Sequence, residues 1–251
     1  MAGHLSKQGY GVSVYNRSKE KSKLWTEKYN GKYFTSVKEA VTNSDIVFSC
    51  VGNDTDLRDI TLGEDKAFSA MKPDSVFVDH TTTSSDIASE LYKKAKEYEI
   101  HFLDAPVSGG EVGAVKGELT VMIGGEKPIF DRVNSVITAY AKNITLVGGP
   151  GKGQVAKMIN QICIAGLIQA LSEAISFSEK KNKVAKNKEN LISKIMLKLG
   201  SNFKFLVFNN WLVFKFSEHR RYCIELVLIV AGELGNDAKP GGPCRSPAAH
   251  G

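Results

Sequence analysis

The fold of this chain is decided by the stretch D-A-P-V-S-G-G at residues 104–110. The apolar run at residues 100–105 predicts a strand that ends in a loop formed by Ser108, Gly109 and Gly110. Glycines allow such a loop to aim several backbone N–H groups, together with the serine hydroxyl, at one anion. The stretch therefore predicts a strand followed by an anion-binding loop.

A second stretch, G-K-G-Q-V-A-K-M-I-N-Q at residues 151–161, predicts the start of a helix after a Pro-Gly signal. The 3.6-residue period of a helix puts Lys157, Asn160 and Gln161 on one face. A lysine beside two amides, together with an anion-binding loop, suits an alcohol substrate that carries a carboxylate. Each stretch alone has a plainer interpretation. The loop also fits an ordinary tight turn, and Lys157 also fits a solvent-exposed helix lysine.

From residue 11 to residue 147, the sequence alternates β-rich runs with helical patterns. Strands are predicted at residues 11–15, 45–51, 76–79, 100–105, 119–123 and 144–147, and helices at residues 19–29, 35–43, 84–98 and 128–140. This alternation predicts an α/β fold with a doubly wound, parallel sheet. Ligands of such sheets bind at the carboxyl ends of the strands.

The two stretches, in this order and spacing, resemble the β-hydroxyacid dehydrogenase family. That family includes 3-hydroxyisobutyrate dehydrogenase, tartronate semialdehyde reductase, glyoxylate/succinic semialdehyde reductase and, more distantly, 6-phosphogluconate dehydrogenase. The resemblance covers residues 1–180. It implies an NAD(P)-binding Rossmann-like domain at residues 1–148 and an interdomain helix at residues 149–180, which starts a helical domain. It also implies that intact relatives are homo-oligomers.

Both ends of the chain depart from the family pattern. A dinucleotide-binding fold begins with a strand and G-x-G-x-x-G, whereas residues 1–9 resemble the second half of the helix that follows this motif. We therefore expect an N-terminally truncated domain that lacks the first strand and the glycine-rich loop. Residues 181–251 match no part of the helical domain, and we expect them to be non-native or disordered.

The end of the first predicted strand indicates the cofactor. Family members that prefer NAD carry an acidic residue at this position, but this chain has Asn16, Arg17 and Ser18. A guanidinium there pairs with the 2′-phosphate of NADP. We therefore expect NADP as the preferred cofactor, with NAD as the alternative. Arg17 also fits an exposed arginine in a turn.

By the resemblance, two further loops are expected to contact the cofactor. Val51, Gly52 and Asn53 are expected along its adenosine side, and Thr82 is expected near the nicotinamide ribose. The first of these loops also fits a plain Gly-Asn turn. His80 fits a hydrogen-bonded histidine at the end of a strand better than it fits a catalytic base.

The resemblance implies an oxidoreductase that interconverts a short 3-hydroxy acid and its semialdehyde. Lys157 is expected to donate and accept the proton, because partial desolvation brings the pKa of a lysine toward neutrality. The Ser108-Gly109-Gly110 loop is expected to bind the substrate carboxylate, and Asn160 or Gln161 the reacting oxygen. The alternative is an inactive truncated or frameshifted fragment of such an enzyme.

Composition sets the remaining expectations. The 251 residues are 42% hydrophobic and 24% charged, which is typical of a soluble globular protein. The net charge of +6 comes largely from scattered lysines, so we expect no nucleic-acid partner. The four cysteines show no metal-ligand spacing, and Cys50 and Cys163 are predicted to be small core residues. Without a signal peptide or a spanning segment, we expect a cytoplasmic protein with no membrane partner.

Overall fold

The computed structural model describes residues 1–180 and 228–232. Its strands are β1 (Gly11–Tyr15), β2 (Lys32–Phe34), β3 (Ile46–Ser49), β4 (Val76–Asp79), β5 (His101–Asp104), β6 (Val107–Ser108), β7 (Leu119–Gly124), β8 (Ala141–Gly148) and β9 (Leu228–Gly232). Its helices are α1 (Ala2–Lys7), α2 (Lys19–Lys28), α3 (Val37–Val41), α4 (Asp54–Thr61), α5 (Ala67–Ala70), α6 (Ser85–Glu97), α7 (Gly110–Lys116), α8 (Lys127–Ile137) and α9 (Lys152–Lys180). The predicted strand–helix alternation is confirmed, whereas β2, α4, α5 and α7 are short elements that the sequence did not reveal.

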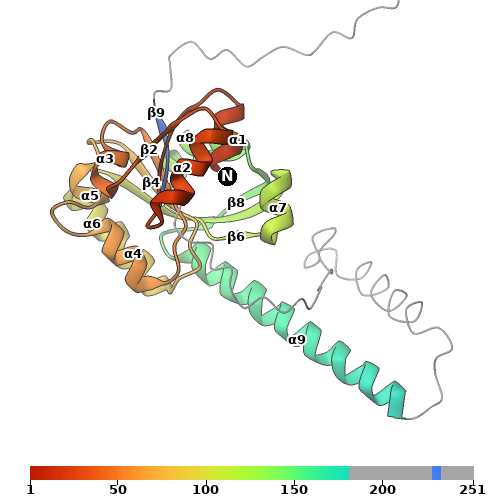
Figure 1. Cartoon of the computed structure of the whole chain (residues 1–251). Coiled ribbons are helices and arrows are strands. Elements are labelled where there is room, and N and C mark those ends of the chain that lie inside the picture. The colour runs from red at the N-terminus through yellow and green to blue at the C-terminus, as the bar shows by residue number, and fades with distance from the viewer. Residues whose placement is uncertain (181–227, 233–251) are drawn as a thin grey trace, which may run out of the picture.

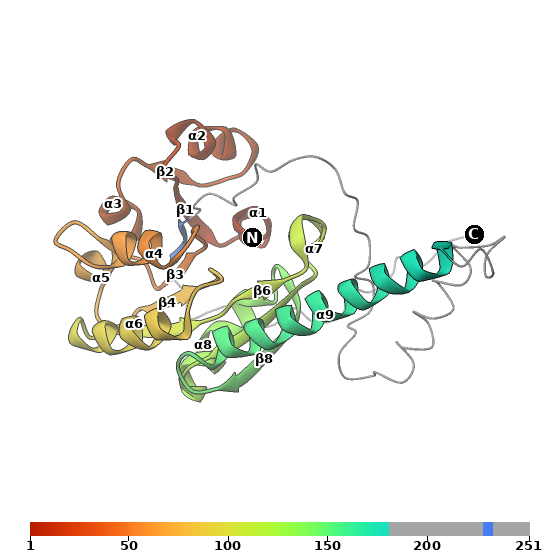
Figure 2. The ribbon, with the colours of Figure 1, turned by 90° about the horizontal axis from the view of Figure 1, so that it is seen from below.

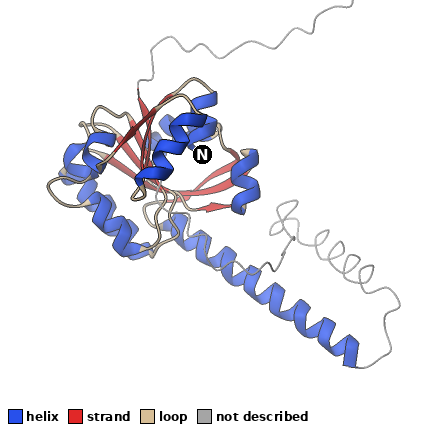
Figure 3. Ribbon diagram, in the orientation of Figure 1, coloured by secondary structure: helices blue, strands red, loops and turns tan. Residues whose placement is uncertain are grey.

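One twisted sheet runs through the domain in the order β2-β1-β9-β3-β4-β5-β7-β6, with β8 paired to β7 (Figures 1 and 3). The neighbours β1–β2, β3–β4 and β4–β5 are parallel, as predicted. β3 and β4 are buried along their whole length, because helices cover both faces of the sheet. The Rossmann-like, doubly wound character of the fold is therefore confirmed.

Two hydrophobic clusters form the core, one on each face of the sheet. Side chains alternate between the faces, so Val76 and Val78 of β4 enter one cluster while Phe77 between them enters the other. The first cluster packs the sheet against α1 and α8, and the second against α3, α4, α5 and α6. Helix α6 illustrates the local cause, because Ser84 caps it by accepting the Ile87 N–H and its apolar residues share one face.

Strand β9 is a difference from the predicted sheet. It lies between β1 and β3 and is antiparallel to both, with Val230 opposite Ser13 on one side and Val47 on the other. The gap between β1 and β3 presents two strand edges with unpaired backbone groups, and the extended apolar segment L-I-V-A-G satisfies both. Of the residues after 180 that were expected to be non-native or disordered, residues 228–232 form strand β9. The remainder, residues 181–227 and 233–251, lies outside the described residues.

The second difference lies at the other end of the sheet. β7 is antiparallel to β5 and to β6, while β8 is parallel to β7. The chain reverses direction between β6 and β7, which are joined through α7 and pair antiparallel. The crossover through α8 then restores a parallel pair. The sheet is therefore mixed rather than wholly parallel.

Helix α9 begins against β5, β7, β8 and α6 and then extends away from the domain (Figure 2). From Met158 onward most of its side chains are exposed, including Ile162. Cys163 lies in this exposed part and is not a core residue, whereas Cys50 at the end of β3 is buried as predicted. By length and composition alone the segment Lys152–Ala174 could cross a membrane. Core helices of soluble proteins also have these properties.

Candidate active site

The parallel strands β1, β3, β4 and β5 end at one edge of the sheet, and the loops that follow them carry most of the predicted site residues. After β1, Asn16 is buried and its side-chain oxygen accepts the Ser18 N–H at 2.8 Å. This local turn leaves Arg17 exposed at the edge. The Arg17 guanidinium lies 3.7 Å from the Asp56 carboxylate in the first turn of α4.

The loop after β3 is tied both to α4 and to the loop after β4. The Val51 N–H donates to the Thr81 hydroxyl at 3.0 Å. Asn53 caps α4, since its side-chain oxygen accepts the Asp56 N–H at 3.0 Å. Gly52 is exposed, and a Cβ there would lie 2.5 Å from an Asp56 carboxylate oxygen. The Gly-Asn pair thus serves as a helix cap, and its backbone remains open to solvent.

Beneath the loop after β4 lies a buried carboxylate. Asp79 accepts hydrogen bonds from the Ser49 hydroxyl at 2.7 Å and from the Thr81 hydroxyl at 2.6 Å. Its second carboxylate oxygen has no partner among the described residues. Burial raises the pKa of Asp79 to about 7, although these hydrogen bonds oppose the shift. Thr81 is fixed by Asp79, and Thr82 after it is exposed at the tip of the loop.

His80 is a buried structural residue, as predicted. Its Nδ1 lies 2.6 Å from the carbonyl oxygen of Ala105, and its Nε2 lies 2.7 Å from the Tyr140 hydroxyl. A carbonyl can only accept, so Nδ1 carries the proton and Tyr140 donates to Nε2. Burial lowers the pKa of His80 to about 4. A neutral histidine with both nitrogens engaged joins the ends of β4 and β5.

The Ser-Gly-Gly stretch is more ordered than the predicted loop. Ser108 belongs to β6 and pairs with Thr120 of β7, and α7 begins at Gly110. Gly109 and Gly110 both have positive φ, at 135° and 55°. A Cβ at Gly109 would lie 2.9 Å from the Leu119 side chain, so this position requires glycine.

The start of α9 is anchored by a carboxylate that the sequence analysis did not single out. Asp104 at the end of β5 is buried and accepts the Gly151 N–H at 2.7 Å and the Gln154 N–H at 2.9 Å. One turn beyond Gln154, the Lys157 side chain is largely buried, and desolvation lowers its pKa. Of the other predicted residues on α9, Asn160 is half-buried and Gln161 is exposed.

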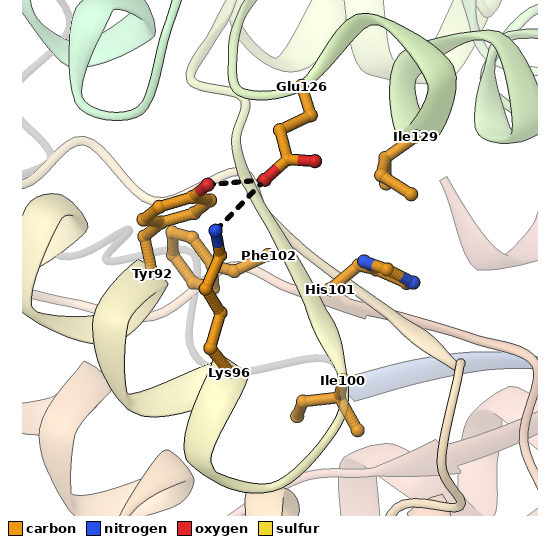
Figure 4. Close-up of a pocket in the computed structure, with 7 residues that line it drawn as sticks. All are labelled: Tyr92, Lys96, Ile100, His101, Phe102, Glu126 and Ile129. Atoms are coloured by element: carbon orange, nitrogen blue, oxygen red, sulfur yellow. Dashed lines mark hydrogen bonds and ion pairs between the residues drawn. The ribbon is translucent and has the colours of Figure 1, made fainter.

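A separate hollow lies between α6, β5 and α8 (Figure 4). Tyr92 and Lys96 of α6 both point at Glu126, and the Lys96 ammonium is 3.3 Å from its carboxylate. The hollow has a volume of about 10 Å³, which barely holds one water molecule. It lies near the amino end of β5, beside His101, and is therefore remote from the strand ends that carry the predicted site residues.

The comparison with known proteins agrees with this geometry. Residues 1–149 match the family described as the NAD binding domain of 6-phosphogluconate dehydrogenase. The chain belongs to this family. The predicted resemblance to the β-hydroxyacid dehydrogenases is thereby confirmed, and residues 1–149 form an NAD-binding domain.

Relatives of this NAD-binding domain are oxidoreductases. An uncharacterized oxidoreductase of Shewanella frigidimarina is 50% identical over 179 residues, which cover 71% of this chain and 62% of that protein. A probable 3-hydroxyisobutyrate dehydrogenase-like protein of Arabidopsis thaliana is 39% identical over 180 residues, 72% of this chain and 60% of that protein. The chain thus spans less than two thirds of the length of these curated relatives.

Solved structures lead to the same family. The structure of 3-hydroxyisobutyrate dehydrogenase of Mycobacterium tuberculosis with L-serine superposes with a TM-score of 0.71 at 27% identity. The match covers 77% of this chain and 65% of that one.

The residues at the strand ends fit a dinucleotide. Gly52 is exposed and has no side chain to block close approach, and Arg17 offers a cation on the same side. Beside Thr82, the Thr83 hydroxyl is buried without a partner among the described residues. The residues predicted to hold the cofactor remain Asn16, Arg17, Ser18, Val51, Gly52, Asn53 and Thr82.

Proposed function

We propose that the protein is an NADP-dependent oxidoreductase that interconverts a short 3-hydroxy acid and its semialdehyde. The observation that carries this proposal is the buried Lys157, whose helix is fixed to the loop after β4 in a domain of an NAD-binding family. A desolvated lysine with a lowered pKa exchanges protons closer to neutral pH.

Each protein group has a defined part in this proposal. Bound NADP supplies the acceptor or donor of hydride. The neutral amine of Lys157 takes the hydroxyl proton during oxidation, and the ammonium returns it during reduction. The Ser108 hydroxyl and the Gly109–Gly110 segment bind the substrate carboxylate, while Asn160 or Gln161 donates a hydrogen bond to the reacting oxygen.

The preference for NADP is supported by the loop after β1. Arg17 stands where a carboxylate would bind the ribose 2′-hydroxyl of NAD. An exposed guanidinium offers two parallel donors to a 2′-phosphate.

The test is a fluorescence titration with NADPH and NADH, followed by initial rates with NADP and a panel of short 3-hydroxy acids. We expect Lys157→Ala to lower kcat on the order of a hundredfold or more with little change in the dissociation constant of NADPH. Lys152→Ala, an exposed lysine at the start of the same helix, is the matched control. Near-normal turnover by Lys157→Ala would contradict the role of Lys157.

The second candidate is a chain that performs no cofactor turnover. Strand β9 favours it, because its amino end, and not its carboxyl end, lies beside Tyr15 at the edge where the cofactor would bind. A parallel strand at this place would lead directly into a phosphate-binding turn and helix. The titration separates the two candidates, since the second predicts no saturable NADPH binding.

A further inference from the structure

Gln154 joins α9 to the loop after β4 by two hydrogen bonds. Its side chain is fully buried. The amide nitrogen donates to the carbonyl oxygen of Thr81 at 2.7 Å, and the amide oxygen accepts the Thr83 N–H at 3.1 Å. These partners fix the orientation of the amide, because a carbonyl only accepts and a backbone N–H only donates. The two bonds flank Thr82, the residue predicted to face the nicotinamide ribose.

The backbone of the same residue is fixed from the opposite side. Asp104 accepts the Gln154 N–H as well as the Gly151 N–H, so a carboxylate from β5 caps the first turn of α9. Gly153 lies directly on the strands, since a Cβ there would be 2.5 Å from the Met122 carbonyl oxygen and 2.6 Å from that of Asp104. These contacts hold the start of α9 against β5 and β7, and the Gln154 side chain joins it to the loop after β4.

Lys157 follows Gln154 by three residues and lies on the same face of α9, about 4.5 Å further along the axis. It is only 8% exposed, whereas Met158 is 41% exposed and Ile159 55%. The burial of Lys157 thus depends on how closely this face of the helix approaches the strand ends. The Gln154 side chain keeps this face of α9 close to the strand ends, because it is hydrogen-bonded to the backbone on both sides of Thr82.

We propose that Gln154 is a positioning residue that sets the place of Lys157 relative to the loop after β4. This inference rests on the proposed function, since Lys157 is the proton-transfer group there. Gln154 itself touches no reacting atom. Its loss displaces or rehydrates the lysine without removing it.

The test compares Gln154→Met, which keeps the side-chain length but forms neither bond, with Gln154→Glu, which keeps only the acceptor for Thr83. Gln169→Met is the matched control, because Gln169 is exposed on the same helix and bonds only to Glu173 among the described residues. Steady-state rates give kcat and KM. Acetylation of Lys157, followed by peptide mass spectrometry across a pH series, gives the pH midpoint of its reactivity.

We expect Gln154→Met to lower kcat roughly ten- to hundredfold with a smaller change in KM, because a misplaced catalytic group costs rate more than binding. The pH midpoint of Lys157 acetylation should rise toward that of an ordinary exposed lysine, since burial is what lowers the pKa of Lys157. Gln154→Glu should also have a lower kcat, because it keeps only one of the two hydrogen bonds. Gln169→Met should match the unsubstituted protein in both measurements.

An unchanged kcat, or an unchanged acetylation midpoint in a folded Gln154→Met protein, would overturn the proposal. If Gln154→Met does not fold, Gln154→Glu supplies kcat and KM, while its acetylation midpoint is left aside because a carboxylate one turn from Lys157 raises the pKa of the amine directly. If the unsubstituted protein shows no turnover, the proposed function fails, but the acetylation midpoints still decide whether Gln154 positions Lys157. The two failures are therefore distinguishable.

Discussion

The Arg17 guanidinium lies 3.7 Å from the Asp56 carboxylate and so joins the loop after β1 to the first turn of α4. Asp56 is held in turn by the Asn53 cap and lies next to the bare backbone of Gly52. The cation proposed to bind a 2′-phosphate thus already has an anionic partner. A bound 2′-phosphate and Asp56 would compete for the same guanidinium.

Substitution of this pair changes cofactor affinity in opposite directions. Arg17→Ala removes the charge-assisted hydrogen bonds to the 2′-phosphate, so we expect NADPH to bind about tenfold or more weakly while NADH changes little. Asp56→Asn keeps the shape but removes the competing charge, so we expect tighter NADPH binding. Fluorescence titrations measure both. Equal losses for NADPH and NADH in Arg17→Ala would contradict 2′-phosphate recognition.

The pH dependence of oxidation should follow the proton on Lys157. Only the neutral amine accepts a proton, and desolvation lowers the pKa of Lys157 from 10.5. We therefore expect kcat/KM to rise with pH and to level off below the titration range of an ordinary lysine. Lys157→Arg keeps the positive charge but cannot deprotonate near neutrality, so it should lose the rise together with most of the rate. An identical pH profile in Lys157→Arg would assign the proton transfer to another group.

Asp79 should make the protein less stable as the pH rises. Its pKa is raised from 3.8 to about 7 in the folded state, so the folded state binds more protons than the unfolded chain between these values. The free energy of unfolding should fall across this range, by at most about 4 kcal/mol.

Urea unfolding of Asp79→Asn, compared with the unsubstituted protein between pH 4 and pH 8, measures this effect. Because its pKa is lowered to about 4, His80 makes the free energy of unfolding rise with pH between 4 and 6.5. This contribution is present in both proteins and cancels in their difference. The stability difference between them should therefore shrink as the pH rises toward 7. A difference that is constant with pH would show that Asp79 does not titrate in this range.

A single proline substitution can test whether β9 completes the sheet between β1 and β3. Val230 pairs with Ser13 and Val47 on its two sides, and a proline in a central strand removes a ladder hydrogen bond. We expect Val230→Pro to lower the free energy of unfolding by roughly 2–4 kcal/mol. Lys19→Pro, at the first position of α2, is the control, because proline is tolerated there. Equal stability of the two variants would show that β9 does not complete the sheet.

The sequence predicted the elements whose signals are local. The strand at residues 76–79 occurs as predicted, and the helix predicted at residues 84–98 occurs as α6, because apolar period and helix caps act within one element. The buried role of His80 also followed from its place at a strand end. Cys163 was assigned to the core wrongly, since a helical pattern does not reveal where α9 leaves the domain.

The tertiary structure alone identified the partners of these elements. Asp104 and Gln154 lie 50 residues apart, and Gln154 and Thr81 lie 73 apart, so no local pattern indicates their hydrogen bonds. The placement of β9 between β1 and β3 likewise depends on which strand edges are open in space. By itself the sequence predicted the family, the longer strands and helices up to α9, and the position of the lysine on that helix. Only the folded backbone decided how deeply Lys157 is buried and what completes the sheet, because both depend on contacts between distant segments.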